Sequence, residues 1–173
     1  MNAFAHLEAA LQCDLALTTG QVARFYGLHL HPQALEHEGF SLTTRTIAPT
    51  ARSRESALRE VSFVTLEPDA RAGHALRHLV GVAELRHRLQ ARVGDWRVQE
   101  YGAIITPDAE WHRGSSRIAV EFDASRYALA TVHEKAQYFR NAFDGQVWAV
   151  SSQTRRNSLT AVLGFSPALV KPF

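Results

Sequence analysis

Apolar residues recur at helical spacing near the start of the chain, where Phe4, Leu7 and Leu11 fall on one stripe. Two short helices are predicted next, one stopped by Gly27 and one over residues 31–37 with proline in its first turn. The order helix, helix, tight turn, helix is typical of a helix-turn-helix.

Alternating apolar and polar residues then predict two strands, at residues 42–47 and 61–66. These strands would be the two arms of a wing, so we expect a small winged helix-turn-helix-like domain over residues 1–72. Residues 49–60 fit this scheme least well, because they are Arg/Ser-rich at first and helix-like later. A long wing tip and an inserted helix both stay open for that segment.

The pattern changes after residue 72, where a second domain over residues 73–173 is predicted. Helical and strand-like spacing alternate there, and a last helix follows near residues 155–163. The predicted order is α-β-β-β-α-β, and the fold class is therefore α/β (α+β). The successive elements of this order are expected at residues 74–92, 96–103, 109–112, 117–122, 127–142 and 146–151.

The composition is that of a soluble globular protein, with 46% hydrophobic and 21% charged residues in 173. No run approaches the roughly 18 apolar residues of a membrane span, and no secretory signal is visible, so we expect no membrane partner and a cytoplasmic location. Cys13 is the only cysteine, which excludes an intrachain disulfide and a cysteine-based zinc site.

Charge is divided unevenly between the two predicted domains. Residues 1–72 contain six Arg and eight acids, a net charge of −2, and residues 73–173 contain thirteen Lys or Arg and nine acids, a net of +4. If one half faces a polyanion, bulk charge favours the second. The side chains expected near nucleic acid are Gln33, Arg45, Arg52 and Arg54 in the first half and Arg155 and Arg156 in the second, although an exposed basic helix start is an alternative for the last pair.

Four polar residues stand where a buried core should be apolar. Asp108 begins the second predicted strand of the second domain, Glu121 and Asp123 end the third on one face, and Lys135 lies in the next helix. Two carboxylates at neighbouring strand ends can bind one Mg²⁺, which polarises a phosphodiester and lowers the pKa of a bound water. A nearby lysine can stabilise the developing negative charge.

Each of these residues also has a purely structural alternative. An acid at a strand end, taken singly, is more often a solvated cap or turn residue. Lys135 is one of only two lysines among nineteen basic residues, which indicates either a required compact amine or a stray surface residue. The order and spacing of the four residues therefore matter more than any one of them.

Pro107-Asp108-Ala109, the Glu121-Phe122-Asp123 strand end and Lys135 with Tyr138 together resemble the PD-(D/E)XK nuclease superfamily. More narrowly, they resemble the replication-relaxation family of plasmid-borne proteins, in which a winged helix-turn-helix precedes a nuclease-like core. That family has a "His…Asn-Glu" helix before the core strands. Here His78 and Glu84 correspond to it, with Ala83 in place of Asn, and the likeness covers about residues 74–165.

The resemblance implies a restriction-endonuclease-like αβββαβ core with a site for Mg²⁺ or Mn²⁺. Asp108, Glu121 and Asp123 would be the metal ligands, and Asp108, Glu121 and Lys135 the catalytic residues. Glu84 would add a ligand or orient water, and a surface glutamate is the alternative for it. The superfamily's usual lysine lies two residues after the strand glutamate, where this chain has Asp123, so Lys135 would supply the amine from the helix.

Three functions stay open at this point. One is a metal-dependent nuclease that the helix-turn-helix places on DNA. Another is a non-catalytic replication or regulatory factor whose relic nuclease core serves homodimer formation or phosphate contact. In the third, the N-terminal half is a protein–protein interaction module.

Overall fold

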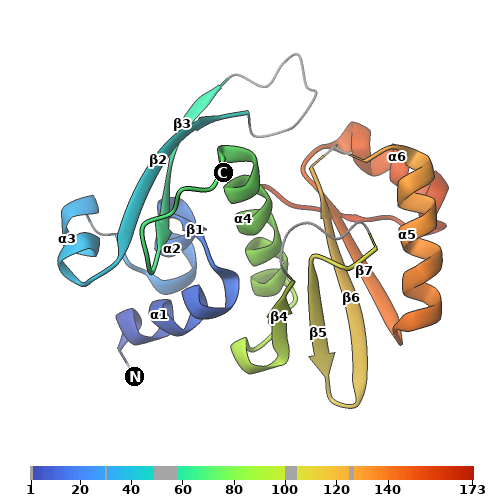
Figure 1. Ribbon diagram of the computed structural model, residues 1–173, viewed down its shortest axis with the longest axis horizontal. Coiled ribbons are helices and arrows are strands. Elements are labelled where there is room, and N and C mark those ends of the chain that lie inside the picture. The colour runs from blue at the N-terminus through green and yellow to red at the C-terminus, as the bar shows by residue number, and fades with distance from the viewer. Residues whose placement is uncertain (1, 30, 49–57, 100–104, 125–126) are drawn as a thin grey trace.

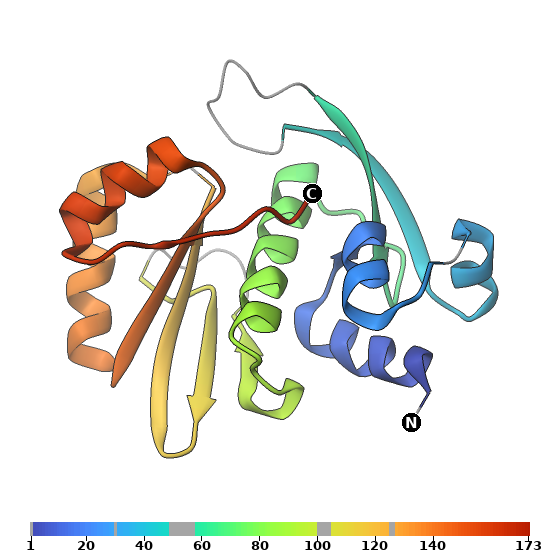
Figure 2. The same cartoon turned by 180° about the vertical axis from the view of Figure 1, so that it is seen from behind.

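The computed structural model describes residues 2–29, 31–48, 58–99, 105–124 and 127–173. A three-stranded sheet and a five-stranded sheet lie on opposite sides of one long helix, α4 (Gly73–Arg88), as both views show (Figures 1 and 2). The protein is therefore a mixed α/β structure, as expected. None of the helices in the described ranges is long and apolar enough to cross a membrane.

The N-terminal part contains three helices and a small antiparallel sheet in which β3 lies between β1 and β2. The predicted helices and strands are all present, and a two-residue strand, β1, precedes the second helix. The elements are α1 (Ala3–Asp14), β1 (Leu17–Thr18), α2 (Thr19–Tyr26), α3 (Pro32–His37), β2 (Ser41–Ile47) and β3 (Arg59–Thr65).

Local sequence explains where α2 begins and ends. The Thr18 hydroxyl accepts a hydrogen bond from the backbone N–H of Gln21, whose side chain in turn accepts from the backbone N–H of Thr18. This reciprocal pair is a capping box. Gly27 ends the helix in the left-handed region at φ +66°, which glycine adopts without steric cost.

The C-terminal part follows the predicted order α-β-β-β-α-β. Its elements after α4 are η1 (Val93–Asp95), β4 (Trp96–Val98), β5 (Ala109–Arg113), β6 (Ser116–Asp123), α5 (Leu129–Ala142), β7 (Gly145–Val150), α6 (Gln153–Leu163) and β8 (Ala168–Leu169). The short strand β8 was not predicted, because Pro167 and only two paired residues give it no alternating pattern. Of the segment 49–60, the described residues Arg59 and Glu60 belong to β3, and residues 49–57 lie outside the described part of the chain.

The five strands lie in sequence order from β4 to β8. Strands β4, β5 and β6 are antiparallel neighbours, whereas β6, β7 and β8 run parallel. A parallel pair needs a long crossover, and α5 supplies it between β6 and β7. Helices α5 and α6 cover one face of this sheet and α4 covers the other (Figure 1).

Helix α4 contributes to the apolar cores on both of its sides. Leu76 and Val80 pack with Phe63 of the small sheet, whereas Val82 and Leu85 pack with the five-stranded sheet. The two sheets thus share one helix, and the division at residues 72 and 73 into two domains stays a prediction.

A buried polar network adds to this apolar contact. The Arg86 guanidinium in α4 donates to both carboxylate oxygens of Asp14 in α1, at 2.7 and 2.6 Å. It also lies 2.9 Å from Nε2 of His87, which is 3.0 Å from the Tyr26 hydroxyl. The His87 ring stacks on Phe25 with centroids 3.7 Å apart. Because Arg86 can only donate, His87 Nε2 must accept, and the imidazole is neutral.

Glycine at position 81 allows α4 to lie close to the sheet. A Cβ built there would lie 2.1 Å from the nearest Phe122 ring atom, which no real contact permits. We expect Gly81→Ala to lower the free energy of unfolding by about 3 kcal/mol, because the helix or the buried ring must move. Urea denaturation measures the change, and Gly94→Ala, whose Cβ would meet open space, is the matched control. Equal stability of the two variants would contradict this packing.

Histidine 87 predicts a specific pH dependence of stability. Burial, and secondarily repulsion by Arg86 and Arg24, lowers the pKa of His87 from 6.5 to about 3. Between these pH values His87 is protonated in the unfolded chain but not in the folded one. The free energy of unfolding therefore falls as the pH is lowered from about 6.5 towards 3.

The test is urea denaturation across this pH range. We expect His87→Gln to remove about 2 kcal/mol of the acid-induced loss, a value reduced for the partial exposure of the ring. The exposed His133 provides the control His133→Gln, which should follow the wild-type curve. Parallel curves for wild type and His87→Gln would show that the ring is protonated in the folded protein.

Candidate functional site

Asp108 lies at the junction of β5, β6 and α4. It directly precedes Ala109, which pairs with Val120, so it lies opposite Glu121 on the neighbouring strand. Its Oδ2 accepts a hydrogen bond from the backbone N–H of Phe122 at 2.7 Å, and its Oδ1 lies 3.0 Å from Nε2 of His78. Two strands and one helix therefore fix the direction of this carboxylate.

Glu121 and Lys135 form a buried ion pair beside it. The Lys135 amine in α5 donates to Glu121 Oε1 at 2.6 Å, and the two side chains are 2% and 0% exposed. The amine also lies 4.8 Å from the ring centroid of Tyr127 and 5.7 Å from that of Phe139. Aromatic faces attract a cation, so Lys135 is held from several directions.

The second oxygen of Glu121 is in a different situation. Glu121 Oε2 is buried and has no hydrogen-bond partner among the described residues. Burial, and then the negative charge of Asp108, raises the pKa of Glu121 well above its usual range, although Lys135 acts in the opposite direction. The strand register likewise places Asp108 opposite Glu121. The structure thus places Asp108, Glu121 and Lys135 in one region, and their roles as metal ligands and catalytic residues stay predictions.

Asp123 shares a face of β6 with Glu121 but has a different partner. Its Oδ2 accepts from Arg155 in α6, from Nε at 2.9 Å and from a terminal nitrogen. The same guanidinium donates to the Tyr127 carbonyl at 2.7 Å. Asp123 therefore anchors the start of α6. Its Oδ2 is occupied by Arg155, although the residue was expected to be a metal ligand.

The other basic and acidic candidates are placed elsewhere. Arg155 and Arg156, expected to contact nucleic acid, bind within the protein, Arg155 to Asp123 and Arg156 to Ser166 Oγ and the Pro167 carbonyl, both at 2.9 Å. Glu84 accepts from Gln21 at 2.9 Å and from Arg24 at 2.7 Å, so its carboxylate faces α2. It is six residues from His78, and a helix of 3.6 residues per turn puts such residues on different faces. The structure thus does not bring Glu84 to Asp108.

The candidates for DNA contact in the first half are only partly described. Gln33 is exposed on α3. Arg45 on β2 donates to the carbonyls of Thr44 and Asp69, at 3.1 and 3.3 Å. Arg52 and Arg54 lie outside the described residues.

His78 is a site residue that the sequence reading did not include. It was matched only to the helix motif, yet its ring contacts Asp108 and tilts against Phe122 at 6.0 Å between centroids. His78 could have been found from its position among the buried residues of α4, one turn before Gly81.

The donor set can be compared with what a divalent cation needs. Within the described ranges, no group of three or more His, Cys, Asp or Glu is arranged to hold a metal ion. Asp108 and Glu121 nevertheless bring carboxylates together, and Glu121 Oε2 is an unpartnered buried oxygen. Mg²⁺ is commonly held by one or two carboxylates with water and phosphate oxygens, so these two residues fit such an ion. Arg155 pairs with Oδ2 of Asp123, as Lys135 does with Oε1 of Glu121, so the role of Asp123 as a ligand stays a prediction.

Comparison with known proteins adds no relative. No protein-family model matches the chain, and neither a curated protein nor a solved structure is similar to it. The resemblance to the replication-relaxation family therefore stays a prediction from the motifs. The roles of these residues have to be argued from their geometry.

The buried pair predicts a strong dependence of stability on Lys135. We expect Lys135→Met to lower the free energy of unfolding by about 3 kcal/mol, because Glu121 is then buried among acids without its cation. The double variant Glu121→Gln with Lys135→Met should recover most of the loss, since it removes both charges. Chemical denaturation measures both, with Glu134→Gln as an exposed neighbour control. Additive losses in the double variant would mean that the two side chains do not interact.

Proposed function

We propose that this protein binds DNA and has a PD-(D/E)XK nuclease-like core of the plasmid or mobile-element type. The observation that carries the proposal is the convergence of Asp108, Glu121 and Lys135 at the ends of adjacent strands and on the helix that follows them. The element order α-β-β-β-α-β around these residues supports it. So does the order of the N-terminal part, in which three helices precede a two-stranded hairpin, as in a winged helix-turn-helix.

The proposed activity is metal-dependent hydrolysis of a phosphodiester. Asp108 and Glu121 would hold one Mg²⁺ or Mn²⁺, and such an ion polarises the phosphodiester and lowers the pKa of a bound water. His78 and the Phe122 backbone keep the Asp108 carboxylate oriented. The Lys135 amine supplies a fixed positive charge next to Glu121, where negative charge on phosphorus can be stabilised. Arg155 removes the charge of Asp123 from this chemistry.

A second function is favoured by the burial of the same residues. Glu121 and Lys135 are 0% and 2% exposed and neutralise one another, which is the arrangement of a structural ion pair. In this alternative the core is a relic, and the protein is a non-catalytic DNA-binding replication or regulatory factor.

The decisive experiment combines binding and cleavage in one set of variants. The purified protein is incubated with supercoiled, linear and branched DNA in the presence of Mg²⁺ or Mn²⁺, and Mn²⁺ binding is measured by calorimetry. We expect Asp108→Asn to lower cleavage at least about 100-fold and to weaken Mn²⁺ binding. DNA affinity should be unchanged, because the asparagine oxygen can still accept from Phe122 N–H. Glu134→Gln, on the exposed face of α5, is the control.

The outcomes separate the candidate functions. DNA binding without cleavage or Mn²⁺ binding supports the non-catalytic factor. Cleavage that survives in both Asp108→Asn and Glu121→Gln removes the site assignment. Absence of DNA binding at low salt removes both proposals and leaves a protein–protein interaction module.

A further inference from the structure

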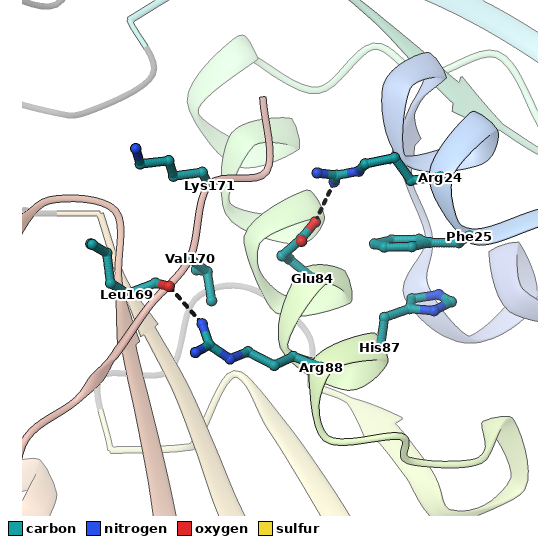
Figure 3. A pocket seen from close by; sticks show the side chains of 8 residues that line it. All are labelled: Arg24, Phe25, Glu84, His87, Arg88, Leu169, Val170 and Lys171. Atoms are coloured by element: carbon teal, nitrogen blue, oxygen red, sulfur yellow. Dashed lines mark hydrogen bonds and ion pairs between the residues drawn. The ribbon is translucent and has the colours of Figure 1, made fainter.

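A pocket lies away from the three converging residues, between α2, α4 and the segment that begins with Leu169 of β8 (Figure 3). Its volume is about 610 Å³, which is within the range of small-molecule sites. Figure 2 shows the chain after α6 running back past α4, and Leu169, Val170 and Lys171 of this segment line the pocket. Residues distant in sequence thus form its walls.

The lining is strongly basic. Arg24, Arg88 and Lys171 contribute three positive charges, and Glu84 contributes the one carboxylate of the lining. Three cations minus one anion leave a net charge of +2, because His87 is neutral at physiological pH. Glu84 is already bound by Arg24 and Gln21. Its charge is therefore not available to neutralise the other two cations.

The remaining cations are positioned from separate elements. Arg88, in the last turn of α4, donates to the Leu169 carbonyl at 2.6 Å, which directs its guanidinium towards the tail and into the pocket (Figure 3). Lys171 is exposed on that tail, two residues after Leu169. Positive side chains along the rim of a pocket favour the approach of an anion. The net charge of this lining therefore favours an anionic ligand.

The stacked rings of Phe25 and His87 form another wall. The ring centroids are 3.7 Å apart and the ring planes are nearly parallel, at 13°. The contacts of His87 with Arg86 and Tyr26 hold its ring in this position. A rigid aromatic wall beside a cationic rim suits a ligand with both a planar or sugar part and a phosphate. A single carboxylate would satisfy fewer of the donors than the several oxygens of a phosphate.

We propose that this pocket binds a phosphate group carried by a nucleotide unit. The nucleotide is either part of a nucleic-acid chain or free in solution, since the same cations recognise the phosphate of both. The inference does not depend on cleavage, because none of its residues belongs to the group formed by Asp108, Glu121 and Lys135. A nucleic-acid chain bound here would contact α2 and α4 together.

The experiment uses the full chain and two probes, free 5′-dAMP and a fluorescent DNA duplex. Binding of dAMP is followed by NMR chemical shifts, and binding of the duplex by fluorescence anisotropy over a range of salt concentrations. The variants are Arg88→Gln with Lys171→Gln, which removes two positive charges, and Glu84→Gln, which removes the negative one. Arg140→Gln, an exposed arginine on α5, is the matched control.

We expect the double variant to bind the preferred probe about tenfold more weakly and Glu84→Gln to bind it more tightly. If DNA occupies the pocket, the double variant should also lower the salt slope of the affinity by about 2, one for each lost phosphate contact. If a free nucleotide occupies it, only the dAMP shifts should change. These opposite effects of opposite charges would not arise from a loss of packing.

The proposal is overturned if neither probe is affected by the double variant, or if Glu84→Gln weakens binding as the double variant does. Absence of DNA cleavage and Mn²⁺ binding, with intact pocket binding, would remove the proposed hydrolysis and leave this inference standing. Intact DNA cleavage, together with probe binding that the pocket variants do not change, would overturn this inference and leave the proposed function standing.

Discussion

The structure depends on one helix that has to satisfy two apolar surfaces. Helix α4 is buried between the two sheets, and its residues complete the core on each side. Such a helix cannot be amphipathic in the usual sense, because only narrow strips of its surface reach solvent. Gly81 brings it against Phe122, and Arg86 ties it to Asp14. The positions of His78 on one face and Glu84 on another follow from this placement.

Burial of charge is the second constraint, and it links the site to its surroundings. Glu121 is fully buried in a strand that is covered on both faces. Burying a carboxylate there without a partner would lower the free energy of unfolding by roughly several kcal/mol. Lys135 offsets the charge of Glu121, and Arg155 offsets that of Asp123. The same pairing that makes the acids tolerable also limits their reactivity.

Most helices and strands could be predicted from the sequence, because they depend on the periodicity of apolar residues and on local turn and cap residues. The stop of α2 at Gly27, the proline at the start of α3 and the helix between β6 and β7 are all local signals. Lys135 was recognisable too, since it falls on the apolar stripe of α5 with Val132, Ala136 and Phe139.

The parts that were missed depend on contacts between distant residues. Arg155 is 32 residues from Asp123, and no local pattern shows that a basic residue at a helix start will turn inward. The two alternatives for Glu84 could not be decided from the sequence for a similar reason, because the helix that carries it has two buried sides and the motif does not say which side it faces. Strand β8 pairs through only two residues, too few for a pattern.

The path of the chain after α6 has a consequence for how the protein folds during synthesis. This segment adds β8 to the edge of the large sheet, and Phe173 then packs with the cluster that contains Ile47 and Phe63 (Figure 2). The first half therefore leaves the ribosome before Phe173, which packs against its core. Because such non-local contacts form late, the nascent chain exposes that apolar surface at least until Phe173 has been made. Chaperone binding or aggregation during expression should therefore concentrate on the side of α4 that faces the small sheet.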